Sequence, residues 1–255
     1  MNKYKIIYAC FLLLILPMKS QGENLFHGKI IKIQGHVYIL NRVNENVSVD
    51  KDNIYLKIDD TVVTDTGSKA VIEFNDGYIS VLDEKSKLRM ERSGLLSQLS
   101  GKVYYIFKKV FTKQPRKIQT TYATIGIRGT TFIVNVGPSN NSIALKEGGL
   151  NIESPNDVFK IIKKPVAYNY SDFKQETEQA FKKMSDEYQK YKQNINEEFI
   201  EYKKIFSLEP DSVVSFNNNV VTQGLLSDDL NLEFQAFDDF YSAISRPELD
   251  REDLD

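Results

Sequence analysis

The sequence predicts a mainly β protein that continues into one long α-helix and a short C-terminal segment. Residues 28–155 contain about ten short apolar runs, separated by turn residues every 8–12 positions, which is typical of an all-β fold. Residues 171–206 contain no glycine and no proline, and their apolar residues recur at a helical period. Strand spacing alone leaves a sandwich, a barrel and a solenoid open.

The first 22 residues have the pattern of a secretory signal peptide. Lys3 and Lys5 are followed by the apolar run Ile6–Pro17 and by the small-residue site Ser20-Gln21-Gly22. This run is shorter than the roughly 18 residues that a membrane-spanning helix needs, although an uncleaved N-terminal anchor is the alternative. We therefore expect an extracytoplasmic protein, periplasmic or on the cell surface after cleavage.

Cysteine content and charge exclude several classes of protein. Cys10, the only cysteine, lies inside the apolar run, so the mature chain would have neither a disulfide nor thiol chemistry. No other segment approaches 18 apolar residues, so we expect no further membrane span. The net charge of -2 gives no indication of a nucleic-acid partner.

The first half of the β region shows strands and turns in clear alternation. Gly28–Leu40 predicts two strands with a turn near Gln34-Gly35. Lys69–Phe74 alternates in polarity, Asn75-Asp76-Gly77 is typical of a hairpin turn, and Tyr78–Leu82 is the return strand. Further strands are predicted over 54–58, 86–90, 101–107, 142–146 and 149–152.

The densest pattern runs from Thr120 to Val136 and reads TTYATIGIRGTTFIVNV. Its β-branched and aromatic residues favour two strand halves. Glycine inside a strand marks a bulge or a close backbone approach, so we expect Arg128 to lie at a kink between the halves. Two interpretations of Arg128 follow. It pairs structurally with a carboxylate or with turn carbonyls, which we favour, or it anchors a ligand or partner.

The run TTYATIGIRGTTFIV resembles the signature of the FecR domain family, and residues 58–90 resemble the upstream part of that pattern. The resemblance spans residues 28–155, half of the chain. It implies a solenoid-like stack of short strands. The signature residues, with a structural or partner-binding role, are Thr124, Gly126, Arg128, Gly129, Thr130 and Phe132, and the associated turn is Asp76-Gly77.

The resemblance also implies an extracytoplasmic domain that contacts a protein partner. In the best-known members this partner is a TonB-dependent receptor. Those members regulate a sigma factor through a cytoplasmic anti-sigma domain and a membrane helix, and this sequence shows neither part. We therefore do not expect direct transmembrane signalling.

Residues 171–208 predict one long amphipathic helix. From Phe173 to Phe206 the apolar positions recur about every 3.7 residues, Asp172 with Gln175 resembles a capping box, and Pro210 marks the end. The helix either packs along the β domain and covers an edge, or projects and mediates self-association with another chain.

The last part of the chain predicts a small hairpin and a short helix over 211–244. The hairpin turns at Asn217-Asn218-Asn219, and the helix is centred on Phe234, Phe237 and Tyr241. Residues 245–255 read as an acidic disordered tail, because residues 228–255 hold ten acidic and two basic side chains.

The sequence indicates no catalytic residues, no cofactor and no metal site. His27 and His36 have no ligand-spaced partners. The aspartates of the β region lie at turns, where aspartate is favoured for backbone reasons. The basic stretch 108–117 is interpreted as a solvated loop, with contact to an anionic surface as the alternative.

Two functions are consistent with these patterns. The first is a secreted, non-enzymatic binding or scaffolding protein of the bacterial cell envelope that acts on an unidentified envelope protein. The alternative is a protein that binds cell-wall glycan, or an enzyme that acts on polysaccharide, built on a β-solenoid. In the alternative, Tyr78, Tyr104 and Tyr105 would stack on sugars, although we expect core packing for at least half of these tyrosines.

Overall fold

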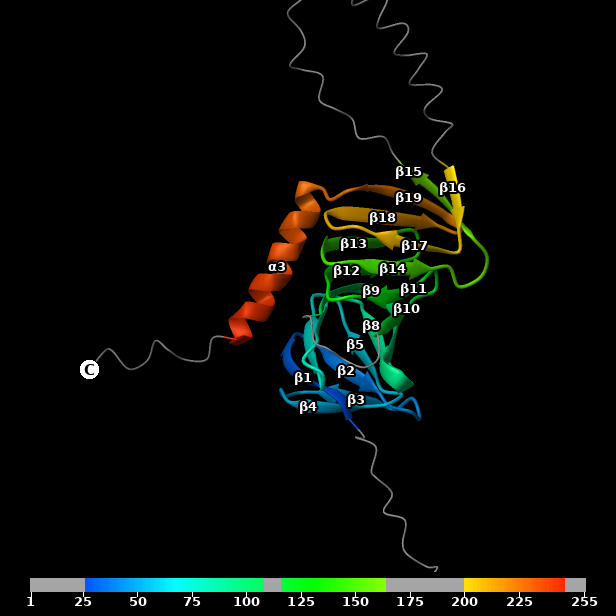
Figure 1. Ribbon diagram of the computed structural model, residues 1–255. Coiled ribbons are helices and arrows are strands. Elements are labelled where there is room, and N and C mark those ends of the chain that lie inside the picture. The colour runs from blue at the N-terminus through cyan, green and yellow to red at the C-terminus, as the bar shows by residue number, and fades with distance from the viewer. Residues whose placement is uncertain (1–25, 108–115, 164–199, 246–255) are drawn as a thin grey trace, which may run out of the picture.

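The computed structural model describes residues 26–107, 116–163 and 200–245, and these form a mainly β fold with one C-terminal helix (Figure 1). The predicted fold class is confirmed in that respect. Nineteen strands lie in two sheets, which we call sheet 1 and sheet 2, and the long strand β9 belongs to both. The helix, α3 (Asp228–Ser245), follows the last strand.

Sheet 1 is antiparallel except where β15 pairs with β19. In spatial order its strands are β4 (Ile54–Lys57), β1 (Phe26–Gln34), β6 (Lys69–Phe74), β7 (Ile79–Leu82), β9 (Leu95–Ile106), β12 (Thr131–Val136), β13 (Asn141–Glu147), β18 (Ser212–Asn217), β19 (Val220–Leu225), β15 (Phe159–Lys163) and β16 (Ile200–Lys203).

Sheet 2 is antiparallel except where β9 pairs with β10. Its order is β3 (Asn46–Val49), β2 (Val37–Leu40), β5 (Thr61–Thr64), β8 (Lys87–Met90), β9, β10 (Lys117–Gln119), β11 (Thr124–Ile127), β14 (Leu150–Glu153) and β17 (Ile205–Leu208). A short 3-10 turn, Arg92–Gly94, joins β8 to β9.

The strand β9 passes from one sheet to the other at Gly101. Residues 96–100 pair with β8 in sheet 2, whereas residues 101–106 pair with β12 in sheet 1. Gly101 has a φ of 85°, and a Cβ atom there would lie 2.2 Å from the Ser86 Oγ atom. Glycine is therefore required at this crossing on both conformational and steric grounds.

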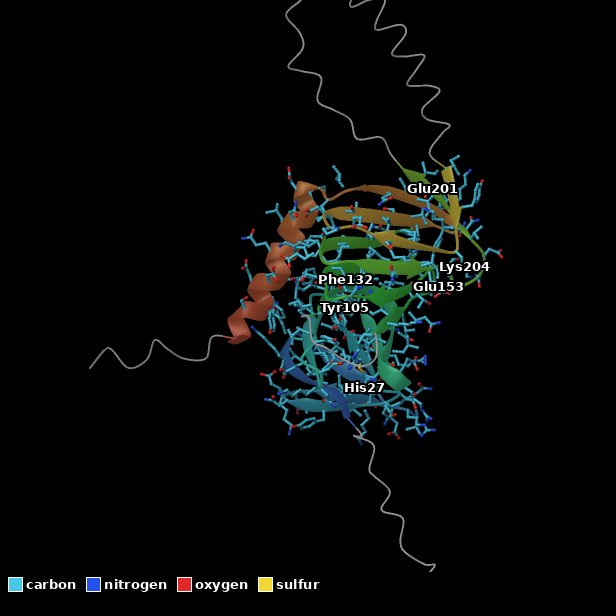
Figure 2. All side chains as sticks on the ribbon, in the orientation of Figure 1. His27, Tyr105, Phe132, Glu153, Glu201 and Lys204 are labelled. Carbon is cyan, nitrogen blue, oxygen red and sulfur yellow. The ribbon has the colours of Figure 1, made fainter. Side chains whose placement is uncertain are left out.

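The main hydrophobic core unites buried side chains from the two sheets. Tyr105 and Phe132 are fully buried, and their rings stack with centroids 5.1 Å apart (Figure 2). The described strands do not close into a barrel, because the sheets end at β3 and β4 on one side and at β16 and β17 on the other. The solenoid-like arrangement is not confirmed.

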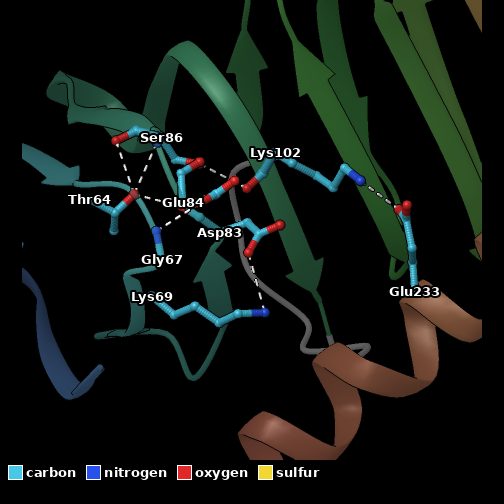
Figure 3. A network of polar contacts seen from close by, with 8 residues as sticks. All are labelled: Thr64, Gly67, Lys69, Asp83, Glu84, Ser86, Lys102 and Glu233. Carbon is cyan, nitrogen blue, oxygen red and sulfur yellow. Dashed lines mark hydrogen bonds and ion pairs between the residues drawn. The ribbon is translucent and has the colours of Figure 1, made fainter. Parts of the chain in front are cut away.

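Where the chain crosses between the sheets, side-chain hydroxyls join successive corners. The Thr64 hydroxyl donates to the Asp83 carbonyl oxygen at 2.6 Å and accepts from the Ser86 N–H at 3.0 Å (Figure 3). The Ser86 hydroxyl donates to the Lys102 carbonyl oxygen at 3.0 Å. These bonds connect the corners at Thr64, Ser86 and Lys102, in addition to the backbone bond from the Asp83 N–H to the Lys102 carbonyl oxygen at 2.9 Å.

The predicted helix over 171–208 is wrong for its last residues. Residues 200–208 form β16 and β17, and residues 171–199 lie outside the described part of the chain. In β17 the side chains alternate, with Phe206 and Leu208 buried and Ile205 exposed, which is a strand period. Tyr202, counted in the helical series, is 66% exposed.

The C-terminal part extends the sheets instead of forming a separate unit. β18 and β19 pair as the predicted hairpin, and β18 also pairs with β13. In the described residues no helix is both long enough and apolar enough to cross a membrane. The predicted signal peptide (1–22) and residues 246–255 of the predicted tail lie outside those residues.

Candidate functional site

Two parts of the FecR-like pattern, the hairpin turn and the bend that contains Arg128, meet at one end of sheet 1, which we call the signature end. There Ile79 at the start of β7 pairs with Ile106 at the end of β9, and Ile106 pairs with Thr131 at the start of β12. The hairpin turn before β7 (residues 75–78) and the bend before β12 (residues 128–130) are therefore brought to neighbouring strand ends.

The Asp76-Gly77 turn is confirmed as the β6–β7 hairpin turn. The Phe74 N–H donates to the Tyr78 carbonyl oxygen at 2.8 Å, and Gly77 has a φ of 78°. The Asp76 carboxylate has a second role, because the Arg116 Nε–H donates to its Oδ2 atom at 2.6 Å. Both side chains are mostly buried, so this pair is shielded from screening by water.

Arg116 joins this turn to the signature segment. Its guanidinium lies 5.6 Å from the ring centroids of Phe74 and Tyr78, a distance typical of cation–π contacts. Its carbonyl oxygen accepts a hydrogen bond from the Ile127 N–H at 3.2 Å. One arginine thus connects two sequence motifs that lie about 50 residues apart, through its side chain on one side and its backbone on the other.

Arg128 does lie at a kink, in the bend between β11 and β12, but it is exposed. It has no hydrogen bond or ion pair with any other residue that the structure describes. The expected pairing of Arg128 with a carboxylate is therefore not seen, and Arg116 makes that contact instead. Burial explains the difference, because the Arg128 side chain is exposed to solvent whereas the Arg116 side chain is mostly buried.

The other signature residues are structural in character. Phe132 is fully buried, and its ring stacks on Phe107 at 5.9 Å. The Thr130 carbonyl oxygen accepts from the Phe107 N–H at 2.8 Å, while the buried Thr130 Oγ1 atom has no hydrogen-bond partner among the residues that the structure describes. Thr124 and Gly126 lie in β11, and an added Cβ at Gly126 would make only ordinary contacts.

Gly129 is packed against a glycine that lies outside the signature. Gly148, with a φ of 89°, would place a Cβ atom 2.2 Å from the Gly129 carbonyl oxygen. The bend at 128–130 and the β13–β14 turn are therefore in direct backbone contact, and neither can move without the other.

His27, in β1, lies beside the Asp76–Arg116 pair and has a lowered pKa. Burial is the main cause, the Arg116 cation adds to it, and the Asp76 carboxylate opposes it. His27 Nε2, Asp76 Oδ1 and Arg116 Nη1 are buried without hydrogen-bond partners among the described residues. His27 also lines an open groove of about 860 Å³ whose wall includes Arg42 and Asp59.

The described residues contain no group of three or more His, Cys, Asp or Glu side chains that could hold a metal ion. Tyr78, Tyr104 and Tyr105, the tyrosines expected to stack on sugars in the alternative function, are all buried. Sugar stacking by these three residues is therefore excluded. The signature end is a junction of turns that holds the mostly buried Asp76–Arg116 pair and presents Arg128 to solvent.

Sequence reasoning missed the role of Arg116. The basic stretch 108–117 was expected to be a solvated loop, and Lys117 is indeed exposed, but Arg116 is directed into the protein. Residues 108–115 lie outside the described residues. No local signal marks Arg116, because its carboxylate and aromatic partners lie about 40 residues away in sequence.

Comparisons with known proteins agree with the resemblance. The family model described as "FecR protein" matches residues 60–151, which include the hairpin turn, Arg116 and the whole signature. No curated protein matches the chain.

Two crystal structures of a "putative anti-sigma factor" from Parabacteroides distasonis ATCC 8503 share 10% identity with the chain, with a TM-score of 0.45 for each. Each alignment covers 69% of this chain and 64% or 63% of that protein, so the chain matches less than two thirds of its length. Residues 60–151, which hold the hairpin turn and the signature, are thus the part of the chain that is similar to the FecR family.

Proposed function

We propose that this protein is a non-enzymatic FecR-like protein of the bacterial cell envelope that acts by contact with another envelope protein. The FecR domain match over residues 60–151 is the observation that carries the proposal. The signature end supports it, because its polar groups are held in a rigid frame of turns and the exposed Arg128 stands at its surface.

The proposed location depends on the N-terminal sequence. Residues 1–22 have the charge and apolar pattern of a secretory signal peptide, which would direct the chain out of the cytoplasm. Fractionation of cells that produce the tagged chain tests this point separately from the partner. Recovery of a shortened chain from the envelope or periplasm is expected, and recovery of the uncut chain from the cytoplasm would contradict the location.

Cross-linking in the native envelope tests the partner. The tagged chain is purified from cross-linked envelopes, and the enriched proteins are identified by mass spectrometry. We expect a membrane regulator or receptor to be enriched, and Arg128→Glu to reduce that enrichment because it reverses an exposed charge at the signature end. Lys117→Glu, an exposed charge in β10 outside the signature, is the matched control.

Two outcomes would contradict the proposal. Enrichment of the chain alone would remove the partner contact from the proposed function. Co-sedimentation of the purified chain with peptidoglycan, unaffected by Arg128→Glu, would favour the glycan-binding alternative instead. A change in sigma-factor target transcripts on deletion of the gene would place the protein contact in signalling.

A further inference from the structure

Helix α3 covers the outer face of sheet 1, opposite the main core. Figure 1 shows the helix running along one side of the fold, from the level of β18 toward that of β1. A second hydrophobic cluster fills the space beneath it. Its sheet residues come from β6, β7, β9, β12 and β13 and are Val71, Ile79, Val81, Tyr104, Ile133 and Ala144.

The helix is held by aromatic side chains spaced three residues apart. Phe234 is fully buried and Phe237 is 3% exposed. The Phe237 ring stacks on Tyr104 with centroids 5.4 Å apart, and Phe234 meets the same ring edge-on at 5.8 Å. Phe240 continues the series at the margin of the cluster. Tyr104 is thus at the centre of the sheet surface on which the helix packs, and we call this surface the seat.

Charges around this seat are complementary to the helix. α3 contains five acidic side chains and no basic one, whereas Lys32, Lys69, Lys102 and Lys146 surround the seat. The Lys102 Nζ atom lies 2.8 Å from the Glu233 carboxylate, and the Lys146 Nζ atom lies 3.9 Å from that of Asp238 (Figure 3 shows the first pair).

The remaining charged contacts follow the same pattern. Lys69 lies over the Phe237 ring at 4.9 Å and also pairs with Asp83 of the sheet at 3.2 Å. Lys32 lies over the Phe240 ring at 4.7 Å. The Tyr104 hydroxyl donates to the Asp238 carboxylate. The seat therefore recognises aromatic rings flanked by carboxylates, which are the groups that α3 presents.

The buried centre of the seat lies within the residues that the FecR family model matches, whereas the helix lies outside them. All six sheet residues of the cluster listed above lie within residues 60–151, and α3 begins only at Asp228. Within the described residues, the contacts that join helix and sheet are made by side chains. The ion pairs are partly exposed, and pairs of that kind contribute little to stability.

We propose that the α3-covered face of sheet 1 is a docking surface for an acidic amphipathic helix of a protein partner, and that α3 occupies it in cis. The partner helix would carry aromatic residues three positions apart, with carboxylates one residue before and four residues after the first. This inference rests on the proposed function, because it names the surface through which the protein contact is made.

A peptide with the sequence of residues 226–245 is the probe. Fluorescence anisotropy of the labelled peptide measures its binding to the full chain. Binding to the unaltered chain should be weak, because the cis helix leaves only a small open fraction of the seat. Phe234→Ala with Phe237→Ala in the chain should tighten binding by at least about tenfold, because the cis helix then competes poorly. Adding Lys102→Glu and Lys146→Glu should remove that gain.

The matched control is a peptide that carries the same two alanines, and it should not bind. Retention of the strand signal in circular dichroism shows that the altered chain is folded. A folded Phe234→Ala, Phe237→Ala chain that fails to bind the unaltered peptide would overturn the proposal and make α3 a permanent part of the core.

Hydrogen exchange of the unaltered chain provides a test that does not depend on the variants. The α3 amides should exchange through a local opening, at least about tenfold faster than those of β9 and β12. Exchange of α3 only with global unfolding would contradict the proposal. The peptide assay uses the purified chain alone, so it tests the docking surface independently of the envelope partner. A failed cross-linking experiment contradicts the proposed function, whereas a failed peptide experiment contradicts only the docking surface.

Discussion

At the residue scale, Gly129 of the signature is confined by its neighbours, whereas the adjacent Arg128 is exposed. Gly129 is confined by Gly148, whose backbone approaches its carbonyl oxygen so closely that a methyl group cannot fit. Arg128, the residue that the sequence pattern makes most conspicuous, contacts none of the described side chains through a hydrogen bond or an ion pair. A close-packed residue and a solvent-exposed one are thus adjacent in this bend.

Gly148→Ala should destabilise the protein by about 2 kcal/mol or more, because it adds left-handed strain and a clash with a backbone oxygen. Gly149→Ala is the control, since no atom lies within 4 Å of its added Cβ and its φ is not positive. Urea unfolding of both variants measures the difference. Equal midpoints would show that the two turns adjust without cost.

Arg116→Ala should lower the free energy of unfolding by about 2 kcal/mol, because it leaves the mostly buried Asp76 carboxylate without its cation. Arg128→Ala should change it by less than about 0.5 kcal/mol, as expected for an exposed side chain without a described partner. Thermal melts of the two variants, side by side, decide which arginine is structural. A larger loss of stability for Arg128→Ala than for Arg116→Ala would refute the structural role of Arg116.

At the element scale, β9 is the strand that unites the two sheets, and a buried glutamine holds its crossing. The Gln98 Nε2 group donates to the carbonyl oxygens of Gly101 at 2.9 Å and Val134 at 3.0 Å. Its Oε1 atom accepts from the Tyr105 hydroxyl at 2.9 Å. Every polar atom of this side chain is satisfied, which is the condition under which a buried amide stabilises a fold.

Gln98→Leu should cost about 2 kcal/mol, because it leaves the buried Tyr105 hydroxyl without its acceptor and removes the hydrogen bonds to two carbonyl oxygens. Tyr105→Phe should cost about 1 kcal/mol. The double variant should be more stable than the sum of the two predicts, because the unpaired hydroxyl is then absent. A double-mutant cycle in urea measures the coupling, and strict additivity would show that the Tyr105–Gln98 bond contributes nothing.

The elements that sequence could predict are those whose pattern is local. Lys69–Phe74 matches β6, and the Asp76-Gly77 turn was identifiable because positive-φ turn residues follow an alternating strand. The end of the predicted helix failed because Tyr202 and Phe206 fit both a helical and a strand period. The strand β17 forms here because it pairs with β14, which lies about 55 residues earlier in the sequence, and a local pattern cannot show such a pairing.

At the scale of the whole molecule, sheet 1 is covered on both faces, by sheet 2 on one and by α3 on the other. The sequence predicted a helix around Phe234 and Phe237 but could not show where it would dock, because docking depends on contacts with strands far away in sequence. For the same reason it located the signature but not Arg116 as its connection to the hairpin turn.

The stability of the whole protein should depend on pH through His27. Burial, strengthened by the Arg116 cation, lowers the pKa of His27 below its ordinary value of 6.5 in the folded state. Below about pH 6.5 the unfolded chain therefore takes up a proton that the folded chain resists, and this proton uptake lowers stability as the pH falls toward the folded pKa. Above that window the effect is absent.

His27→Gln should reduce the loss of stability between about pH 7 and about pH 5.5, because the variant has no imidazole to protonate on unfolding. Urea midpoints of the variant and the unaltered chain, measured at both pH values, give the two slopes. His36→Gln is the matched control, because His36 is exposed and lies outside the Asp76–Arg116 cluster. If His27→Gln leaves the slope unchanged while the protein remains folded, the lowered pKa of His27 would be refuted, because neither the burial of the imidazole nor the Arg116 cation would then act on the folding equilibrium.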